Sequence, residues 1–474
     1  MNWYQWLEDF VWGPWMVALL FGIGLYFTVG SGFFQLRRMG EVFRSTLGGL
    51  FSGQRESKGG ISPFQAVSTA LAGTMGTGNI AGVATAITAG GPGAIFWMWV
   101  SALFGMMTKY AEVALAVQYR ITGPGGEHKG GPMYYMEKGL GMKPLAAVFA
   151  ALCVAASFGI GNMAQSNSIA ESAYAAAGVP PILTGTAVAA VVGFVVVGGV
   201  KRIGKVAEAI IPFLSILYIE ACLYVLYCNW GQIPAAFSLI FHSAFHPVAA
   251  MGGGLGYGVS QAVRLGVARG VFSNEAGLGS APIAHGAADA KSPRVQGMWG
   301  IVEVFLDTIL CCTLTTLVIL TAEEGKLWRC GLDGAQLTTA SFGVVMGDLS
   351  GYLVAFCMLF FALASMLGWC FYGEKALEYL FPHSGRAIGI YRFGFIALAV
   401  VGACVRVEEI WNLSDLLNGL MAVPNLIALA LLSPVVFGTL KEGKAPRRKK
   451  SCKGLSLFTS WPKRVKNVGD PHGK

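Results

Sequence analysis

Three glycines interrupt one apolar stretch within the run Gly73-Thr74-Met75-Gly76-Thr77-Gly78-Asn79. Each glycine weakens a helix by about 1 kcal/mol relative to alanine, so the run predicts a broken helix. A break frees backbone N–H groups at one end, which suit a carboxylate, and carbonyl groups at the other, which suit an ammonium group or Na⁺. The zwitterion of an amino acid needs both. The alternative is that these glycines only allow a neighbouring helix to pack closely.

A second glycine-rich run, at residues 270–280, carries side chains with chemistry of their own. An aromatic ring, a hydroxyl, an amide and a carboxylate follow one another at Phe272, Ser273, Asn274 and Glu275. An ionisable residue inside a membrane segment is by default a candidate functional group. The alternative is a structural ion pair between Glu275 and Arg269 or Arg264.

Two further carboxylates, Glu303 and Asp307, are four residues apart in another apolar stretch. On a helix this spacing places both on one face. They could carry a proton, bind a cation or pair with Arg264, and the sequence leaves all three open.

The composition identifies the elements that must position these groups. Hydrophobic residues make up 54% of the 474 residues and charged residues only 12%, about half the roughly 25% of soluble proteins. This argues against a soluble enzyme, a disordered chain or a fibrous protein and leaves a polytopic membrane protein. A crossing helix needs about 20 apolar residues. Stretches without charge predict eleven spans, at residues 14–35, 62–89, 93–118, 145–163, 182–199, 207–228, 255–286, 297–320, 350–374, 388–405 and 413–438.

The distribution of basic residues predicts the orientation. If the N-terminus is outside, the outer loops hold only Lys326, Arg329 and Arg406, and the other basic residues of the loops face the cytoplasm. The segments 164–181 and 229–254, expected outside, hold no Lys or Arg. The tail from Lys441 to Lys474 contains 11 basic and 2 acidic residues. We interpret it as a cytoplasmic anchor near anionic lipid.

The two glycine-rich segments form an internal repeat. At an offset of 196 residues, six positions are identical: Gln65, Ala66, Val67, Ala72, Ile87 and Gly90 match Gln261, Ala262, Val263, Ala268, Ile283 and Gly286. Five predicted spans separate the two starts, so the copies cross the membrane in opposite directions. Paired, glycine-interrupted segments in inverted halves indicate the binding site of a secondary transporter.

The chain resembles the alanine or glycine:cation symporter family (sodium:alanine symporters) along nearly its whole length except the tail. The motifs that carry the resemblance are GTMGTGNIAGVATAI, GGPGAIFWMW, GPMYYMEKGL, GNMAQSNSIAES, RGVFSNEAGLGSAPIAH and LGWCFYGEKALEYL. The resemblance implies an all-α polytopic membrane protein of about eleven transmembrane helices. Its fold would be a leucine-transporter-type 5+5 inverted repeat with one extra N-terminal helix.

The expected organisation is one transporter domain, residues 1–440, followed by the basic cytoplasmic tail, residues 441–474. Within the domain we expect the extra helix at 14–35, the first repeat at 62–228 and the second repeat at 255–438.

The resemblance also implies roles for individual residues in holding the substrate. Backbone N–H groups at Thr77 and Gly78 would bind its carboxylate. Its ammonium group would contact carbonyls around Thr74 and Phe272, with Ser273, and Asn274 belongs to the same segment. The amide of Gln165 would reach the substrate or, alternatively, form an interhelical hydrogen bond. Phe272 and Trp369 would close the pocket against large side chains.

The same resemblance implies two cation sites built from oxygen ligands. One Na⁺ site would use carbonyls of Ala72, Met75 and Phe361 and the hydroxyl of Ser365. Relatives of this architecture often have two adjacent hydroxyls there, whereas this chain has Ala364-Ser365. A second cation site would use Asn79, Asp307 and Thr308.

The resulting expectation is a symporter, not an enzyme, in the inner (plasma) membrane of a bacterium. It would import small neutral amino acids such as alanine and glycine, with Na⁺ as the coupling ion, by alternating access. The partners are the amino acid and the lipid bilayer, and nucleic acid is not expected. The alternatives are a proton-coupled transporter, a transporter that also accepts serine or glutamine, a channel and, more remotely, a membrane-embedded transferase.

Overall fold

The computed structural model describes residues 7, 10–50, 61–123, 126–246, 255–405 and 407–441, and these are almost entirely helical. The two strands among them, β1 (Ile121–Thr122) and β2 (His128–Lys129), form one short antiparallel pair. The predicted basic tail lies outside the described residues, apart from Lys441.

The elements of the first half run from α2 to α13. Their bounds are α2 (Pro14–Gly30), α3 (Phe34–Arg37), α4 (Met39–Ser45), α5 (Leu47–Leu50), α6 (Pro63–Thr74), η1 (Gly78–Gly82), α7 (Val83–Gly90), α8 (Gly93–Gln118), α9 (Pro132–Leu140), α10 (Lys143–Phe158), η2 (Gly159–Met163), α11 (Ala164–Ala177), α12 (Pro181–Val197) and α13 (Gly199–Cys228).

The elements of the second half run from η3 to α23. Their bounds are η3 (Trp230–Gln232), α14 (Ile233–Phe245), α15 (Leu255–Asn274), α16 (Ala281–Gly286), α17 (Pro293–Val304), η4 (Phe305–Cys312), α18 (Thr313–Thr321), η5 (Ala322–Gly325), η6 (Leu327–Arg329), α19 (Gly334–Met346), α20 (Leu349–Leu380), α21 (Gly385–Cys404), α22 (Val407–Leu431) and α23 (Ser433–Lys441).

Seven described helices are long and apolar enough to cross a membrane, so the chain is an all-α, multi-pass membrane protein. They are Gly93–Gln118, Lys143–Ala177, Arg202–Cys228, Pro293–Gly325, Leu349–Leu380, Gly385–Cys404 and Leu413–Leu431. Two shorter apolar helices, α2 and α12, add to them. The remaining two predicted spans are the glycine-rich ones, where α6–α7 and α15–α16 are interrupted. The total of eleven crossings stays a prediction.

The expected outer end of the fourth span is wrong. The sequence predicts a span at 145–163 and a segment outside at 164–181, whereas α10, η2 and α11 form one continuous helix to Ala177. The glycines of η2 serve packing rather than termination, because a Cβ on Gly161 would collide with the side chain of Trp369 on α20. The π-helical turn keeps the chain helical while it passes this contact.

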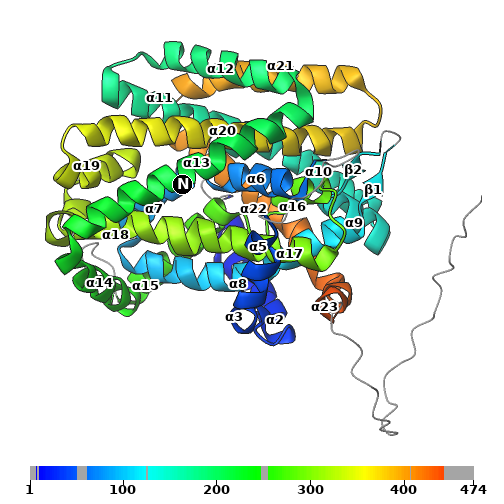
Figure 1. Ribbon diagram of the computed structural model, residues 1–474, viewed down its shortest axis with the longest axis horizontal. Coiled ribbons are helices and arrows are strands. Elements are labelled where there is room, and N and C mark those ends of the chain that lie inside the picture. Colours follow the sequence, from blue (N-terminus) through cyan, green and yellow to red (C-terminus); the bar gives the residue numbers. More distant parts are fainter. Residues whose placement is uncertain are drawn as a thin grey trace, which may run out of the picture.

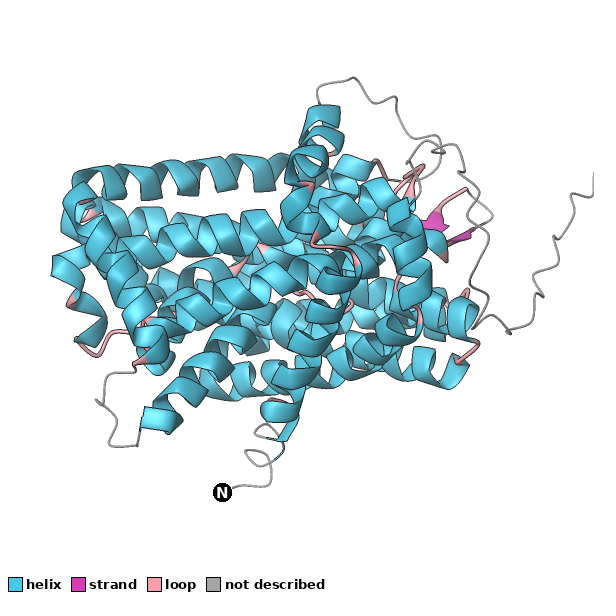
Figure 2. Cartoon of the chain, turned by 90° about the horizontal axis from the view of Figure 1, so that it is seen from below, coloured by secondary structure: helices cyan, strands magenta, loops and turns pink. Residues whose placement is uncertain are grey.

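The interrupted helices lie in the interior of the bundle. Figure 1 shows α12 and α21 together at one edge, α20 beneath them, and α2 with α3 at the opposite edge. Between these edges α6 packs against α13, α16 and α20, and α15 and α17 both pack against α8. Figure 2 shows the long helices running side by side, with the β1–β2 pair at one side of the molecule. Both breaks are therefore enclosed by unbroken helices.

Candidate substrate and cation site

The first glycine-rich run breaks its helix as predicted. Ser62 and Gln65 form a reciprocal capping box that starts α6, and α6 ends at Thr74. Met75 leaves the helical conformation with a ψ of 86°. The helix resumes at Gly78 with the π-helical turn η1. Residues 75–77 thereby leave the regular helical ladder in the interior, where the N–H of Gly76 donates to Asn79 Oδ1 at 3.1 Å, and broken helices at membrane depth occur where they line a site or cavity.

The second run is also broken, over residues 275–280. After α15 ends at Asn274, Glu275, Gly277 and Gly279 adopt positive φ angles of 56°, 96° and 84°. Glutamate rarely adopts this left-handed conformation, which usually marks a functional or strongly constrained position. The helix resumes as α16 at Ala281.

The two breaks are in direct contact. A Cβ built on Gly78 would lie 3.3 Å from the Cα of Ser273. Both residues are buried. The structure therefore brings the N–H end of η1 against the C-terminal end of α15, two of the segments that the sequence assigns to the substrate.

The residues predicted for the first Na⁺ site assemble only in part. The Ser365 hydroxyl donates to the carbonyls of Ala72 at 3.0 Å and Gly73 at 3.1 Å. Phe361, one turn earlier on α20, is buried against the ring of Tyr218. Three oxygen atoms thus meet where α6 and α20 cross, and oxygen is the donor that a hard cation such as Na⁺ prefers.

The residues predicted for the second cation site meet around the carboxylate of Asp307. This group accepts hydrogen bonds from Asn79 Nδ2 at 2.7 Å, from Thr308 Oγ1 at 2.8 Å and from Ser273 Oγ at 2.9 Å. Asn274, expected to contact substrate, donates to Thr308 at 3.0 Å. The cluster therefore joins η1, α15 and η4, so both breaks depend on one buried carboxylate.

The other residues predicted to contact the substrate lie near one of the two breaks or pack against a neighbouring helix. The Oε1 of Gln165 lies 3.4 Å from a Cβ built on Gly76, while its Nε2 donates to Ile160 of its own helix at 3.1 Å. Thr74 donates only within α6. Trp369 packs on Gly161, and Phe272 lies under the guanidinium of Arg269. The closing roles of Phe272 and Trp369 stay predictions.

Three buried polar atoms next to the first break have no hydrogen-bond partner among the residues that the structure describes. They are Thr77 Oγ1, Gln165 Oε1 and the Tyr372 hydroxyl. The Tyr372 hydroxyl lies 2.7 Å from a Cβ built on Gly73. An unsatisfied buried polar group costs about 1–3 kcal/mol, so a cluster of them is typical of a site that a polar ligand completes.

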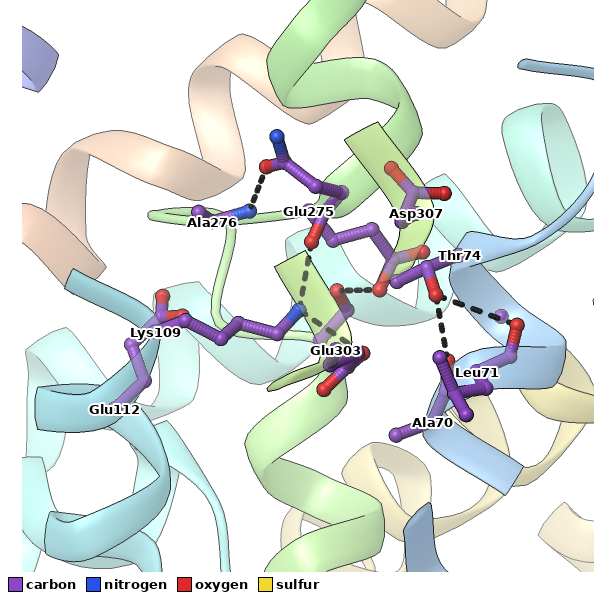
Figure 3. Close-up of polar contacts among 12 residues, drawn as sticks. Ala70, Leu71, Thr74, Lys109, Glu112, Glu275, Ala276, Glu303 and Asp307 are labelled. Atoms are coloured by element: carbon purple, nitrogen blue, oxygen red, sulfur yellow. Dashed lines mark hydrogen bonds and ion pairs between the residues drawn. The ribbon is translucent and has the colours of Figure 1, made fainter. Parts of the chain in front are cut away.

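A buried charged network beside the second break was missed by the sequence reasoning. Lys109 of α8 donates to the carbonyl of Asn274 at 2.8 Å and lies 3.4 Å from Glu303, whose other oxygen is 3.1 Å from His285. Glu112 accepts from the N–H of Gly277 at 3.1 Å. Figure 3 shows Lys109 reaching from its helix toward Glu303. The sequence pattern that could have indicated this network is Lys109 and Glu112, two ionisable residues three positions apart inside an apolar span.

The arginine next to the second break has a partner that was not expected. Arg269 forms a 2.7 Å ion pair with Asp415 of α22. Glu275 instead accepts from Ser280 across the break. Glu303 and Asp307 have the partners described above rather than the suggested Arg264. The structural alternative of an Arg269–Glu275 ion pair is therefore not what the described residues form.

Comparisons with known proteins identify the family of this chain. The family model described as the sodium:alanine symporter family matches residues 1–454. The sodium/alanine symporter AgcS of Methanococcus maripaludis is 47% identical over 442 residues, which cover 92% of this chain and 95% of AgcS. The amino-acid carrier protein AlsT of Bacillus subtilis is 36% identical over 463 residues, 96% of each chain.

A solved structure of an Eremococcus coleocola manganese transporter has a similar fold. The TM-score is 0.51 at 15% sequence identity, over 80% of this chain and 78% of that one. At this identity the likeness concerns the fold alone. On the full-length match, the chain belongs to the sodium:alanine symporter family, a family of transporters and not of enzymes.

Proposed function

We propose that the protein is a symporter that imports small neutral amino acids, alanine and glycine first, together with Na⁺. The observation that carries this proposal is the contact between two broken helices, Gly78 against Ser273, with the Asp307 carboxylate bonded to both sides. Such a junction offers N–H groups, carbonyls and hydroxyls within a few residues. The family and the sodium/alanine symporter AgcS support the choice of ion and substrate.

The substrate carboxylate binds the N–H groups of Thr77 and Gly78, at the start of η1. Its ammonium group binds carbonyls around Thr74 and Phe272, with Ser273 and Asn274 beside them. The unpartnered Oε1 of Gln165 supports an amide contact to the substrate. The close packing at Gly78 and Gly161 supports a small pocket, which Phe272 and Trp369 close.

Na⁺ occupies oxygen sites at the two helix junctions. The first site uses Ser365, the Ala72 carbonyl and carbonyls of Met75 and Phe361, and the second uses Asn79, Asp307 and Thr308. Na⁺ at the second site neutralises the Asp307 carboxylate, and Na⁺ at the first site orders the carbonyls of the first break. The substrate contacts the same two breaks. Ion and substrate affinities are coupled in this way, as linkage between two sites requires.

The transport cycle is alternating access by a 5+5 inverted repeat, residues 62–228 and 255–438, preceded by the extra helix at 14–35. The halves rock about the midplane site and expose it to one side at a time. The domain is a single unit, residues 1–440, in the plasma membrane of a bacterium. The N-terminus is outside, and the basic tail is in the cytoplasm.

The test is uptake of radiolabelled alanine into proteoliposomes with an inward Na⁺ gradient, against a K⁺ control of equal osmolarity. We expect Na⁺-stimulated uptake that unlabelled glycine reduces and leucine does not. Uptake that does not respond to Na⁺ contradicts the coupling ion. Competition by leucine equal to that by glycine contradicts the small pocket.

Proton coupling is a second candidate, and the buried charges favour it. Glu112, Glu275 and Glu303 are fully or almost fully buried near one lysine, Lys109, and one histidine, His285. Three carboxylates share one lysine and one histidine, which leaves room for an exchangeable proton, because an unbalanced buried charge is costly. In Na⁺-free proteoliposomes, alanine uptake driven by an inward pH gradient and abolished in Glu275→Gln indicates proton coupling. Uptake that only Na⁺ drives contradicts it.

A further inference from the structure

A cavity of about 480 Å³ lies far from the broken helices, where α2, α3, α17 and α23 meet. In Figure 1 α2, α3 and α23 lie at the edge opposite α12 and α21. The backbone of Gly30, Ser31 and Gly32 forms one wall of the cavity. Its volume falls in the range of small-molecule sites, about 300–1,000 Å³.

The cavity is lined by basic side chains from three separate parts of the chain. Arg37 and Arg38 come from the end of α3, Arg294 from the start of α17 and Lys441 from the end of α23. Glu41 is the carboxylate that pairs with two of them, Arg38 at 3.2 Å and Arg294. Among the described residues, Arg37 and Lys441 form no ion pair. Among the described residues at the cavity, four side chains are basic and Glu41 is the carboxylate that pairs with two of them, so the described part of the cavity is positively charged.

The same cavity borders an apolar surface that only a bilayer would cover. Along α2 the side chains of Leu25, Tyr26 and Val29 are about half exposed, at 46%, 49% and 56%. Val29 itself lines the cavity, together with Phe34 and Phe437. A basic concavity at the end of an apolar helix matches an amphiphile with an anionic head and apolar chains.

We propose that this cavity binds the phosphate group of an anionic phospholipid, whose acyl chains lie along α2. Arginine forks bind phosphate oxygens through several charge-assisted hydrogen bonds at once. The sequence that follows Lys441 is also basic and contains Arg447, Arg448, Lys449 and Lys450. The site is independent of the transport proposal, since none of its residues belongs to the substrate or cation sites.

The test is lipid binding to the purified, delipidated full chain, measured by native mass spectrometry. The probes are phosphatidylglycerol, zwitterionic phosphatidylcholine and soluble glycerol phosphate. The double variant Arg37→Gln/Lys441→Gln removes two exposed charges of the cavity. The matched control Lys138→Gln/Arg386→Gln removes two exposed charges elsewhere on the face predicted to be cytoplasmic.

We expect phosphatidylglycerol to bind in preference to phosphatidylcholine, and the cavity variant to weaken this binding roughly 30-fold, at about 1 kcal/mol per basic residue. The control variant keeps the wild-type affinity. Equal affinity for the two lipids, or equal losses in the two variants, overturns the site. Full competition by glycerol phosphate at matched concentration overturns the lipid assignment and indicates a soluble phosphate ligand.

Discussion

Residues at the first break are closely packed, and some of their buried polar atoms form no hydrogen bond. Gly78 leaves little space for a side chain, because a Cβ there would lie 3.3 Å from the Cα of Ser273. Thr77 Oγ1 and Gln165 Oε1 are buried without a hydrogen-bond partner among the described residues. Close packing at Gly78 and the burial of these two oxygen atoms therefore occur within the same small region. A ligand that supplies both a donor and an acceptor, such as an amino acid zwitterion, would satisfy them.

At Gly78 the first prediction concerns a single methyl group. In Gly78→Ala the new Cβ would press on Ser273, and we expect alanine uptake to fall about tenfold, equivalent to roughly 1.4 kcal/mol. Gly82→Ala, four residues on in the same π-helical turn, is the control, because its Cβ would meet only the Thr77 carbonyl at 4.0 Å. Equal uptake by the two variants would contradict the proposed contact between Gly78 and the substrate carboxylate. The measurement is initial uptake rate in proteoliposomes.

Ser365 gives the second prediction at this scale. Ser365→Ala removes one oxygen ligand and leaves the Ala72 carbonyl without its hydroxyl donor. We expect the Na⁺ concentration for half-maximal uptake to rise about tenfold, since a hydrogen bond or ligand to a charged group contributes about 1.5–3 kcal/mol. The apparent alanine affinity at saturating Na⁺ should change much less.

A second buried serine of the same helix provides the control for Ser365. Ser350→Ala lies about four turns away on α20 and should leave the Na⁺ dependence unchanged. An unchanged Na⁺ dependence in Ser365→Ala would place the ion elsewhere.

Among the elements, α8 holds the second break in place. Lys109 bonds the last residue of α15 and pairs with Glu303 of α17, and Glu112 one turn on bonds the break itself through Gly277. Asn425 of α22 bonds Gly277 from the other side at 2.9 Å. The interrupted segment is thus held by hydrogen bonds from two helices, α8 and α22, which fix its non-helical backbone in place.

The third prediction tests that role of α8. Lys109→Met removes the lysine partner of the buried Glu303 carboxylate, which keeps only His285 beside it, so we expect a loss of up to about 3–5 kcal/mol in stability. The readout is the thermal unfolding midpoint of the purified protein, which should fall. Lys109→Met/Glu303→Gln should recover part of the loss, because it removes the buried charge that has lost its lysine partner. No recovery in the double variant would mean that Lys109 acts through Asn274 rather than through the ion pair.

On the scale of the whole molecule, the two ends of the bundle differ in charge. The loop between α13 and η3 at Asn229 and the helix α14 carry no Lys or Arg, whereas the turn between α20 and α21 is flanked by Lys375 and Arg386. The basic cavity at Arg37, Arg294 and Lys441 adds to the same imbalance. This asymmetry is what orients a membrane protein during insertion.

The fourth prediction is the orientation itself. A reporter enzyme that is active only outside the cytoplasm should be active when fused after Gly231 and inactive when fused after His383. A reporter active only in the cytoplasm, fused at the same two positions, should give the reverse pattern and controls for expression. Activity of the first reporter at both positions would mean that a span between them is miscounted.

Local sequence was enough for the helical class, the two breaks and the family. Apolar stretches, glycine spacing and recurring motifs each extend over about 20 residues of sequence. The features they predict can therefore be recognised without knowing which other helices pack against them. The glycines at 73–78 and 277–279 interrupt their helices as predicted, since the backbone preference of glycine is local.

Tertiary structure alone decided which charged groups pair and where helices continue. Arg269 pairs with Asp415, which is 146 residues away, instead of with the nearby Glu275. Lys109 of α8 pairs with Glu303 of α17. The helix through Gly161 continues because Trp369 packs there, and the basic cavity exists because three distant segments end together. The reason is physical: a buried charge takes whichever partner the packed helices bring within about 4 Å, and distance along the chain does not set that choice.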